Sequence, residues 1–156
     1  TTSLISSYAQ LLKAGVRVSV GAHDMPDGIG THREMWSLVF GGASPLDALR
    51  AATVNGSCKL NQQSRIGSLR AGMDADFIVL NSNPLDDIRN SVDISFVVRR
   101  GRLIEWPEGS RWPFGWSAEA AWDDCRKWNL GIQSKDKGEL PSLTKSSAVS
   151  RQDAQR

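Results

Sequence analysis

The spacing of hydrophobic positions changes along the chain, and each change predicts a different element. Apolar residues recur every three or four positions from Thr2 to Ala14, which predicts a helix that ends at Gly15. Val16, Val18 and Val20 then alternate with polar residues, which predicts a short strand. A helix that leads directly into a strand is typical of an α/β fold.

Two further helices are predicted after a loop rich in glycine and proline. Thr31 and Glu34 have the spacing of a capping box, so one helix is expected to begin at Thr31 and to end at Gly41-Gly42. Ser44 is followed by proline at the first helical position, which marks the start of the next helix. Asn55-Gly56 is expected to end that helix.

Beyond Ser64 the pattern changes to that of a small β-sheet. Short runs of β-branched and aromatic residues alternate with turn residues such as glycine, asparagine and proline. The expected strands are Ile66–Leu69, Asp76–Asn81, Ile94–Arg99 and Arg102–Trp106, the last two joined at Arg100-Gly101.

Composition narrows the class of protein. The chain has 156 residues with 19 basic and 17 acidic side chains interspersed, a net charge of +2 that gives no support for nucleic-acid binding. No apolar stretch approaches the roughly 18 residues of a membrane span, so no transmembrane segment is expected. Cys58 and Cys125 match neither a disulfide framework nor a zinc spacing, and they indicate no compartment. Because no Met precedes Thr1, we expect the chain to begin inside a longer protein.

Candidate chemistry follows the first predicted strand, which ends on His23 and Asp24. Catalytic groups of α/β barrels gather where strands end, and a carboxylate beside a metal-bound water can accept its proton, so Asp24 fits a general base. The alternative is that Asp24 caps the turn before Pro26. His32, in the first turn of the next helix, could bind a substrate carbonyl or carboxylate. Its alternative is a structural histidine exposed to solvent.

The order of these blocks, from Gly15 to about Leu103, resembles the C-terminal end of the amidohydrolase superfamily. The most specific part is the pattern Gly-Ser-Leu-x-x-Gly-x-x-Ala-Asp-x-x-Val-Leu at Gly67–Leu80. The Gly21-Ala22-His23 turn, together with Thr31-His32 and Glu34-Met35-Trp36, is similar to the imidazolonepropionase-like branch, which includes members fused to TolB-type propellers.

The resemblance implies an α/β fold, namely the C-terminal fragment of a (β/α)8 metal-dependent hydrolase barrel plus strands of a small β-sandwich. Val16–Val20 would be the eighth barrel strand. The expected divisions are residues 1–60 for the last barrel units, 61–106 for the sandwich strands, 107–133 for a Trp- and Pro-rich extension and 134–156 for a disordered tail.

The resemblance also implies an activity: hydrolysis of amide-type C–N bonds, cyclic or peptide-like, in a small substrate by water activated on a divalent metal, with zinc expected. Strand eight of the family ends in Gly-Thr-Asp, whose Asp binds metal and acts as base. Here His23 takes that position and Asp24 follows it, so which of the two binds the metal stays open. His32 is the expected substrate-binding residue.

The remaining metal ligands of the family, four histidines and a lysine on other strands, have no counterparts among the two histidines of this chain. The chain alone is therefore expected to be inactive and to need the rest of the barrel as a partner. The alternative is a non-catalytic, degenerate homologue that acts as a binding or structural module. Either would allow a homo-oligomer.

Overall fold

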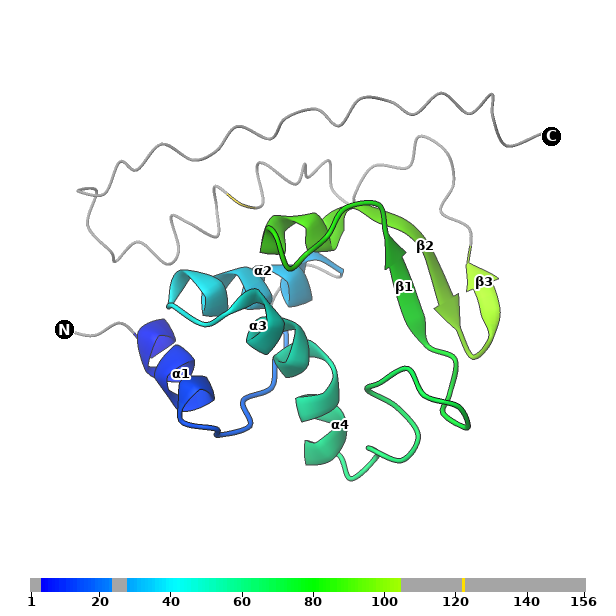
Figure 1. The fold of residues 1–156 in the computed structure, drawn as a ribbon, viewed down its shortest axis with the longest axis horizontal. Helices are drawn as coiled ribbons and strands as arrows, with labels where there is room; N and C mark the ends of the chain where they lie inside the picture. Colours follow the sequence, from blue (N-terminus) through cyan, green and yellow to red (C-terminus); the bar gives the residue numbers. More distant parts are fainter. Residues whose placement is uncertain (1–3, 24–27, 105–121, 123–156) are drawn as a thin grey trace.

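Helices lie on one side of the molecule and a small antiparallel sheet lies on the other (Figure 1). The computed structural model describes residues 4–23, 28–104 and 122. In chain order the elements are α1 (Leu4–Lys13), α2 (Ile29–Phe40), α3 (Pro45–Ala52), α4 (Val54–Lys59), β1 (Phe77–Leu80), the 3₁₀ helix η1 (Ile88–Val92), β2 (Ile94–Arg99) and β3 (Arg102–Ile104). This mixture confirms the predicted α/β class.

The core surrounds α2, which packs against α1, α3 and η1. Trp36 at its centre is fully buried, and α3 approaches it closely through the small residues Ala48 and Ala51. The chain leaves α2 through Gly41, where an added Cβ would lie 2.6 Å from the carbonyl oxygen of Ile5 in α1. A residue without a side chain is therefore required for α1 to lie where it does.

The predicted helix starts are confirmed in one case and corrected in another. Ser44 caps α3, since its hydroxyl accepts a hydrogen bond from the Asp47 N–H at 3.1 Å. In contrast, α2 begins two residues before Thr31, with Gly28 at the N-cap, so the capping box at Thr31 and Glu34 is wrong. Glu34 is instead used elsewhere, as described below.

The predicted end of α3 at Asn55-Gly56 is also wrong. The helix ends at Ala52, and Thr53, with φ −129° and ψ −96°, separates it from α4, which continues to Lys59. Asn55 lies inside α4, and its side-chain amide donates to the carbonyl of Val18 at 2.9 Å. The asparagine thus connects α4 to the extended segment that follows α1.

That extended segment is Val16–Val20, the predicted barrel strand, and in the described structure it carries no strand pairing. Its polar backbone groups bond to helices: Val20 N–H donates to the Ala51 carbonyl at 3.2 Å, and Val18 accepts from Asn55. A strand needs a neighbouring strand, and none of the described residues supplies one here. The segment is therefore extended without being part of a sheet.

The sheet has the order β1-β2-β3 and is antiparallel, with Phe77 opposite Val98 and Val98 opposite Leu103. Arg100 and Gly101 form the predicted turn between β2 and β3, both at positive φ. The predicted strand Ile66–Leu69 is wrong, because Gly67 adopts φ +91° and packs directly on Ser57. No second sheet facing this one occurs in the part of the chain that is described, so the sandwich is not confirmed.

The predicted divisions 107–133 and 134–156 lie outside the described residues, apart from Trp122. The Trp122 ring lies 4.4 Å from that of Phe40 and 5.4 Å from that of Trp36, between centroids. Across the described ranges, no helix has the length and apolar character to cross a membrane.

Candidate functional site

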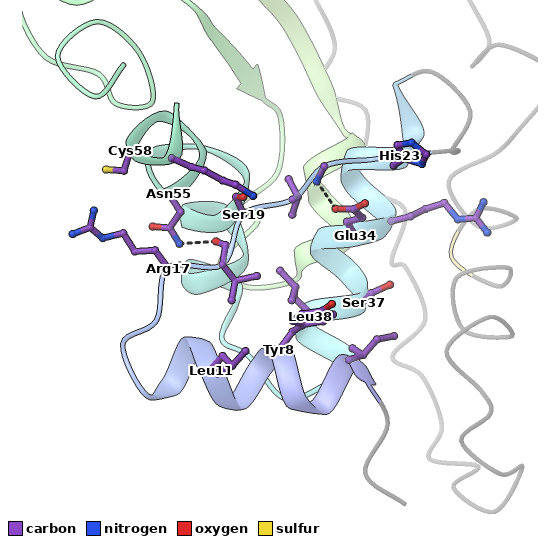
Figure 2. Close-up of a pocket in the computed structure, with 16 residues that line it drawn as sticks. Tyr8, Leu11, Arg17, Ser19, His23, Glu34, Ser37, Leu38, Asn55 and Cys58 are labelled. Carbon is purple, nitrogen blue, oxygen red and sulfur yellow. Dashed lines mark hydrogen bonds between the residues drawn. The ribbon is translucent and has the colours of Figure 1, made fainter. Parts of the chain in front are cut away.

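A hollow of about 1000 Å³ opens between α1, the extended segment, α2 and α4. Figure 2 shows α1 along one side, α2 along another and the extended segment crossing between them. The lining is mixed, with an apolar contribution mainly from α1 and polar groups from the other elements. It includes Tyr8, Leu11, Arg17, Ser19, Gly21, His23, Arg33, Glu34, Ser37, Leu38, Asn55 and Cys58.

One rim of the hollow is a turn held by a carboxylate. The backbone N–H of Gly21 donates to Oε2 of Glu34 at 2.7 Å (Figure 2), and the N–H of Ala22 donates to Oε1 at 2.7 Å. Ala22 has a φ of 49°, in the left-handed region that residues with a Cβ rarely adopt. The two hydrogen bonds hold the chain in this conformation directly before His23.

His23 is exposed and lines the hollow at this rim, beside the Glu34 end of α2 (Figure 2). Asp24, the predicted general base, lies outside the described residues. The structure therefore places one member of the predicted pair at a concave rim.

The described residues do not fit a divalent metal by themselves. A protein site for zinc uses three or four His, Cys, Asp or Glu ligands. Within residues 4–23, 28–104 and 122, no group of three such side chains comes close enough to hold an ion. His23 would have to share a metal with ligands outside these ranges.

His32 lies on the opposite side of α2, in the core. Its side chain is 8% exposed, and its Nδ1 is 3.0 Å from the Ser91 hydroxyl oxygen. Burial lowers the pKa of His32 from 6.5 to about 4, so the imidazole is neutral at pH 7. The alternative of a solvent-exposed histidine is wrong. Substrate binding stays a prediction, although His32 is not among the described residues that line the hollow.

Sequence reasoning missed two residues that shape this site. The spacing of Glu34 predicts a helix cap, and no sequence pattern points to Arg33, which is charged yet only 7% exposed. Both line the hollow from α2. A charged pair at the start of an apolar helix carries no local signal of the face to which each side chain turns.

The sequence of the chain is similar to the sequences of several known enzymes. Ochratoxinase of Aspergillus niger is 33% identical over 122 residues, which cover 72% of this chain and 25% of that enzyme. Imidazolonepropionase of Herpetosiphon aurantiacus is 37% identical over 67 residues, covering 39% of this chain and 15% of the relative. The chain thus spans about a quarter or less of the length of these curated relatives.

The fold of the chain is also similar to that of a solved structure. A Bifidobacterium longum protein assigned as a prolidase superposes with a TM-score of 0.61 and 32% identity, covering 78% of this chain and 30% of that one. These neighbours imply that the helical part of the chain is a fragment of a (β/α)8 barrel. Family members generally bind divalent metals, and the relatives named here are hydrolases.

The amidohydrolase family model matches residues 5–104, which include the described helices and strands from α2 to β3 and nearly all of α1. The resemblance expected from the Gly67–Leu80 pattern and the Gly21-Ala22-His23 turn is thereby confirmed. The chain belongs to the amidohydrolase family.

Proposed function

We propose that this chain is the C-terminal portion of a metal-dependent amidohydrolase that hydrolyses amide-type C–N bonds. The observation that carries the proposal is the turn at Gly21 and Ala22, which is fastened to α2 and presents His23 at the rim of a hollow. The family supports the reaction class, because the model that matches the chain is that of the amidohydrolases.

The proposed roles are those that the sequence indicates. His23 or Asp24 contributes a ligand to a divalent ion, with zinc as the candidate, and residues outside the described ranges contribute the others. Asp24 accepts a proton from water as the water oxygen adds to the amide carbon. The C–N bond then breaks, and the amine leaves with that proton.

The hollow itself is proposed as the surface that takes the rest of the barrel. Its α1 side carries large hydrophobic residues exposed to solvent, namely Tyr8 at 41% and Leu11 at 42% exposure, and Val16 follows at 48%. Large apolar side chains that stay exposed on one side of a hollow support its use as a binding face. When strands and helices cover the floor, the His23 rim remains open for a small-molecule or peptide-like substrate.

The test compares hydrolysis by the purified chain with hydrolysis by the longest protein that its reading frame encodes, called the longer product, both with added zinc. The probes are a panel of N-acyl amino acids, dipeptides and cyclic amides. We expect the longer product to release amine and the chain alone to match the rate without protein. His23→Ala and Asp24→Asn should abolish the activity of the longer product, whereas Asp86→Asn, in an exposed loop, should not.

Two results would contradict the proposal. Hydrolysis by the chain alone would show that no further ligands are needed. If the longer product is folded and loaded with zinc but hydrolyses none of the probes, the proposed amidohydrolase activity is wrong.

A second candidate, a non-catalytic binding module, is favoured by one observation: the described residues hold no set of three metal ligands. The sequence upstream of Thr1 separates the two. A His-x-His strand, with later lysine and histidine positions in frame, supports the enzyme, and a reading frame without them supports the module.

A further inference from the structure

The Glu34 carboxylate connects α2 to the turn at Gly21 and Ala22, which lie 13 and 12 residues earlier in the sequence. Each of its oxygens accepts one backbone N–H, from Gly21 and from Ala22, at 2.7 Å. Hydrogen bonds to an ionised carboxylate are shorter and roughly twice as strong as neutral ones. The pair is therefore a two-point attachment that fixes both the position and the orientation of the turn.

Helix capping does not explain this carboxylate. The N-cap of α2 is Gly28, and Glu34 lies in the second turn, where backbone N–H groups already have partners within the helix. Burial in the core does not explain it either, because Glu34 is only partly buried and is not a member of the core cluster. The carboxylate instead bonds to the Gly21-Ala22 turn, between the extended segment and His23.

The conformation that it holds is unfavourable on its own. A left-handed conformation is unfavourable for a residue with a Cβ, and such conformations persist where the surroundings impose them and concentrate at functional sites. Ala22 has this conformation one residue before His23. Without the attachment, the backbone of Ala22 would relax toward φ below zero and His23 would leave the rim.

We propose that Glu34 is the positioning residue of this site: it holds the Gly21-Ala22 turn so that the His23 imidazole faces the rim of the hollow. This inference rests on the proposed function for its purpose, while the attachment itself is testable without any catalysis.

The first test measures amide hydrogen exchange in the full chain by NMR. In Glu34→Ala, exchange at Gly21 and Ala22 should be about 10- to 100-fold faster, the range given by losing one charged hydrogen bond at each amide. In Glu34→Gln, which keeps one acceptor oxygen, one of the two amides should stay protected. Asp86→Asn removes the same charge from an exposed loop and should change neither amide.

A second readout uses the two histidines as reporter and internal control. Loss of Glu34 should move the ring signals of His23 and leave those of His32, which is held against Ser91 in the core. A merely structural role would instead lower the melting temperature and move both sets of signals.

The third readout is kinetic, in the longer product. A misplacement of about 1 Å can reduce the rate about 100-fold, so Glu34→Ala should lower kcat by about that factor while KM and the melting temperature hold, and Glu34→Gln should be intermediate. Unchanged exchange at both amides, unchanged His23 signals, or a wild-type kcat after local loss of protection would each overturn the positioning role. If the wild-type product hydrolyses nothing, the proposed function fails, and the exchange and ring-signal results still decide the attachment.

Discussion

The two faces of α2 differ in what covers them. On one face, Trp36 and His32 are buried against η1, and the Trp36 indole N–H and the His32 Nδ1 each have a hydrogen-bond partner there. On the other face, Glu34, Ser37 and Leu38 line the hollow. One helix therefore carries both the main stabilising contacts and the candidate site, and substitutions on its two faces should have separable effects.

The packed face connects the helical part of the chain to the sheet. The Trp36 indole N–H donates to the Ile88 carbonyl and the Ser91 hydroxyl oxygen, both at 3.1 Å. Ile88 and Ser91 belong to η1, which also contacts β1. The Arg89 guanidinium lies 5.1 Å from the Trp122 ring, which covers this cluster. A single indole thus joins α2 to the element that leads into the sheet.

Removing that indole should have the largest effect on stability. Trp36→Ala leaves a cavity at a fully buried position and should lower the free energy of unfolding by about 3–5 kcal/mol, measured by chemical denaturation. Trp36→Phe keeps most of the ring but leaves the Ile88 carbonyl without its donor, and should cost about 1–3 kcal/mol. If the alanine variant melts like the wild type, the packed face is not the main source of stability.

The second-largest effect is expected at low pH, which should lower the stability of the same packed face. Because the folded pKa of His32 is about 4 and the ordinary value is 6.5, the unfolded chain takes up the proton first as the pH falls. The contribution of neutral His32 is therefore complete above about pH 6.5 and is lost between 6.5 and 4, a change on the order of 3 kcal/mol.

Denaturation curves at pH 7, 6, 5 and 4.5 measure this change. His32→Asn should flatten the dependence over that range, while His23→Asn, at the exposed rim, should preserve it. A slope that survives in His32→Asn would assign the dependence to other groups.

Sequence analysis predicted the features that depend on neighbouring residues. The Ser44 cap, the hairpin at Arg100-Gly101 and the strand Ile94–Arg99 were found within the limits expected, since each depends on turn chemistry or on a short periodic run. His23, which follows the extended apolar run, lines the hollow, whereas its role as a metal ligand stays a prediction.

The predictions that differ from the structure concern residues whose partners lie far away in the chain. His32 is buried because Ser91, 59 residues later, packs on it, and no local pattern signals that contact. Glu34 has the spacing of a cap, yet its carboxylate bonds to amides 12 and 13 residues earlier. Likewise, Val16–Val20 alternates like a strand, but pairing requires a neighbour that the described residues do not include.

The junction between α1 and α2 offers a test of intermediate size. Gly41→Ala would place a Cβ 2.6 Å from the Ile5 carbonyl oxygen, so α1 must shift, at a cost of about 1–3 kcal/mol. Gly56→Ala, inside α4 with open space around it, is the matched control and should stabilise the chain by about 0.5–1 kcal/mol. Thermal melts of both variants measure the difference. Equal melting temperatures would mean that the α1–α2 contact is looser than the structure shows.

The smallest effect is expected on the hollow side, and its size should depend on what covers the hollow. Leu11 is 42% exposed and lines the hollow, whereas Leu46 on α3 is 45% exposed and does not. In the purified chain, Leu11→Ser and Leu46→Ser should each lower the free energy of unfolding by about 0.5 kcal/mol, since neither side chain is fully packed. In the longer product, Leu11→Ser should lower the free energy of unfolding by about 2 kcal/mol or more, because Leu11 becomes buried when the rest of the barrel covers the hollow. The loss caused by Leu46→Ser should stay the same as in the purified chain. Equal costs for the two substitutions in the longer product would mean that the hollow stays open to solvent, and the barrel would then have to pack on another face.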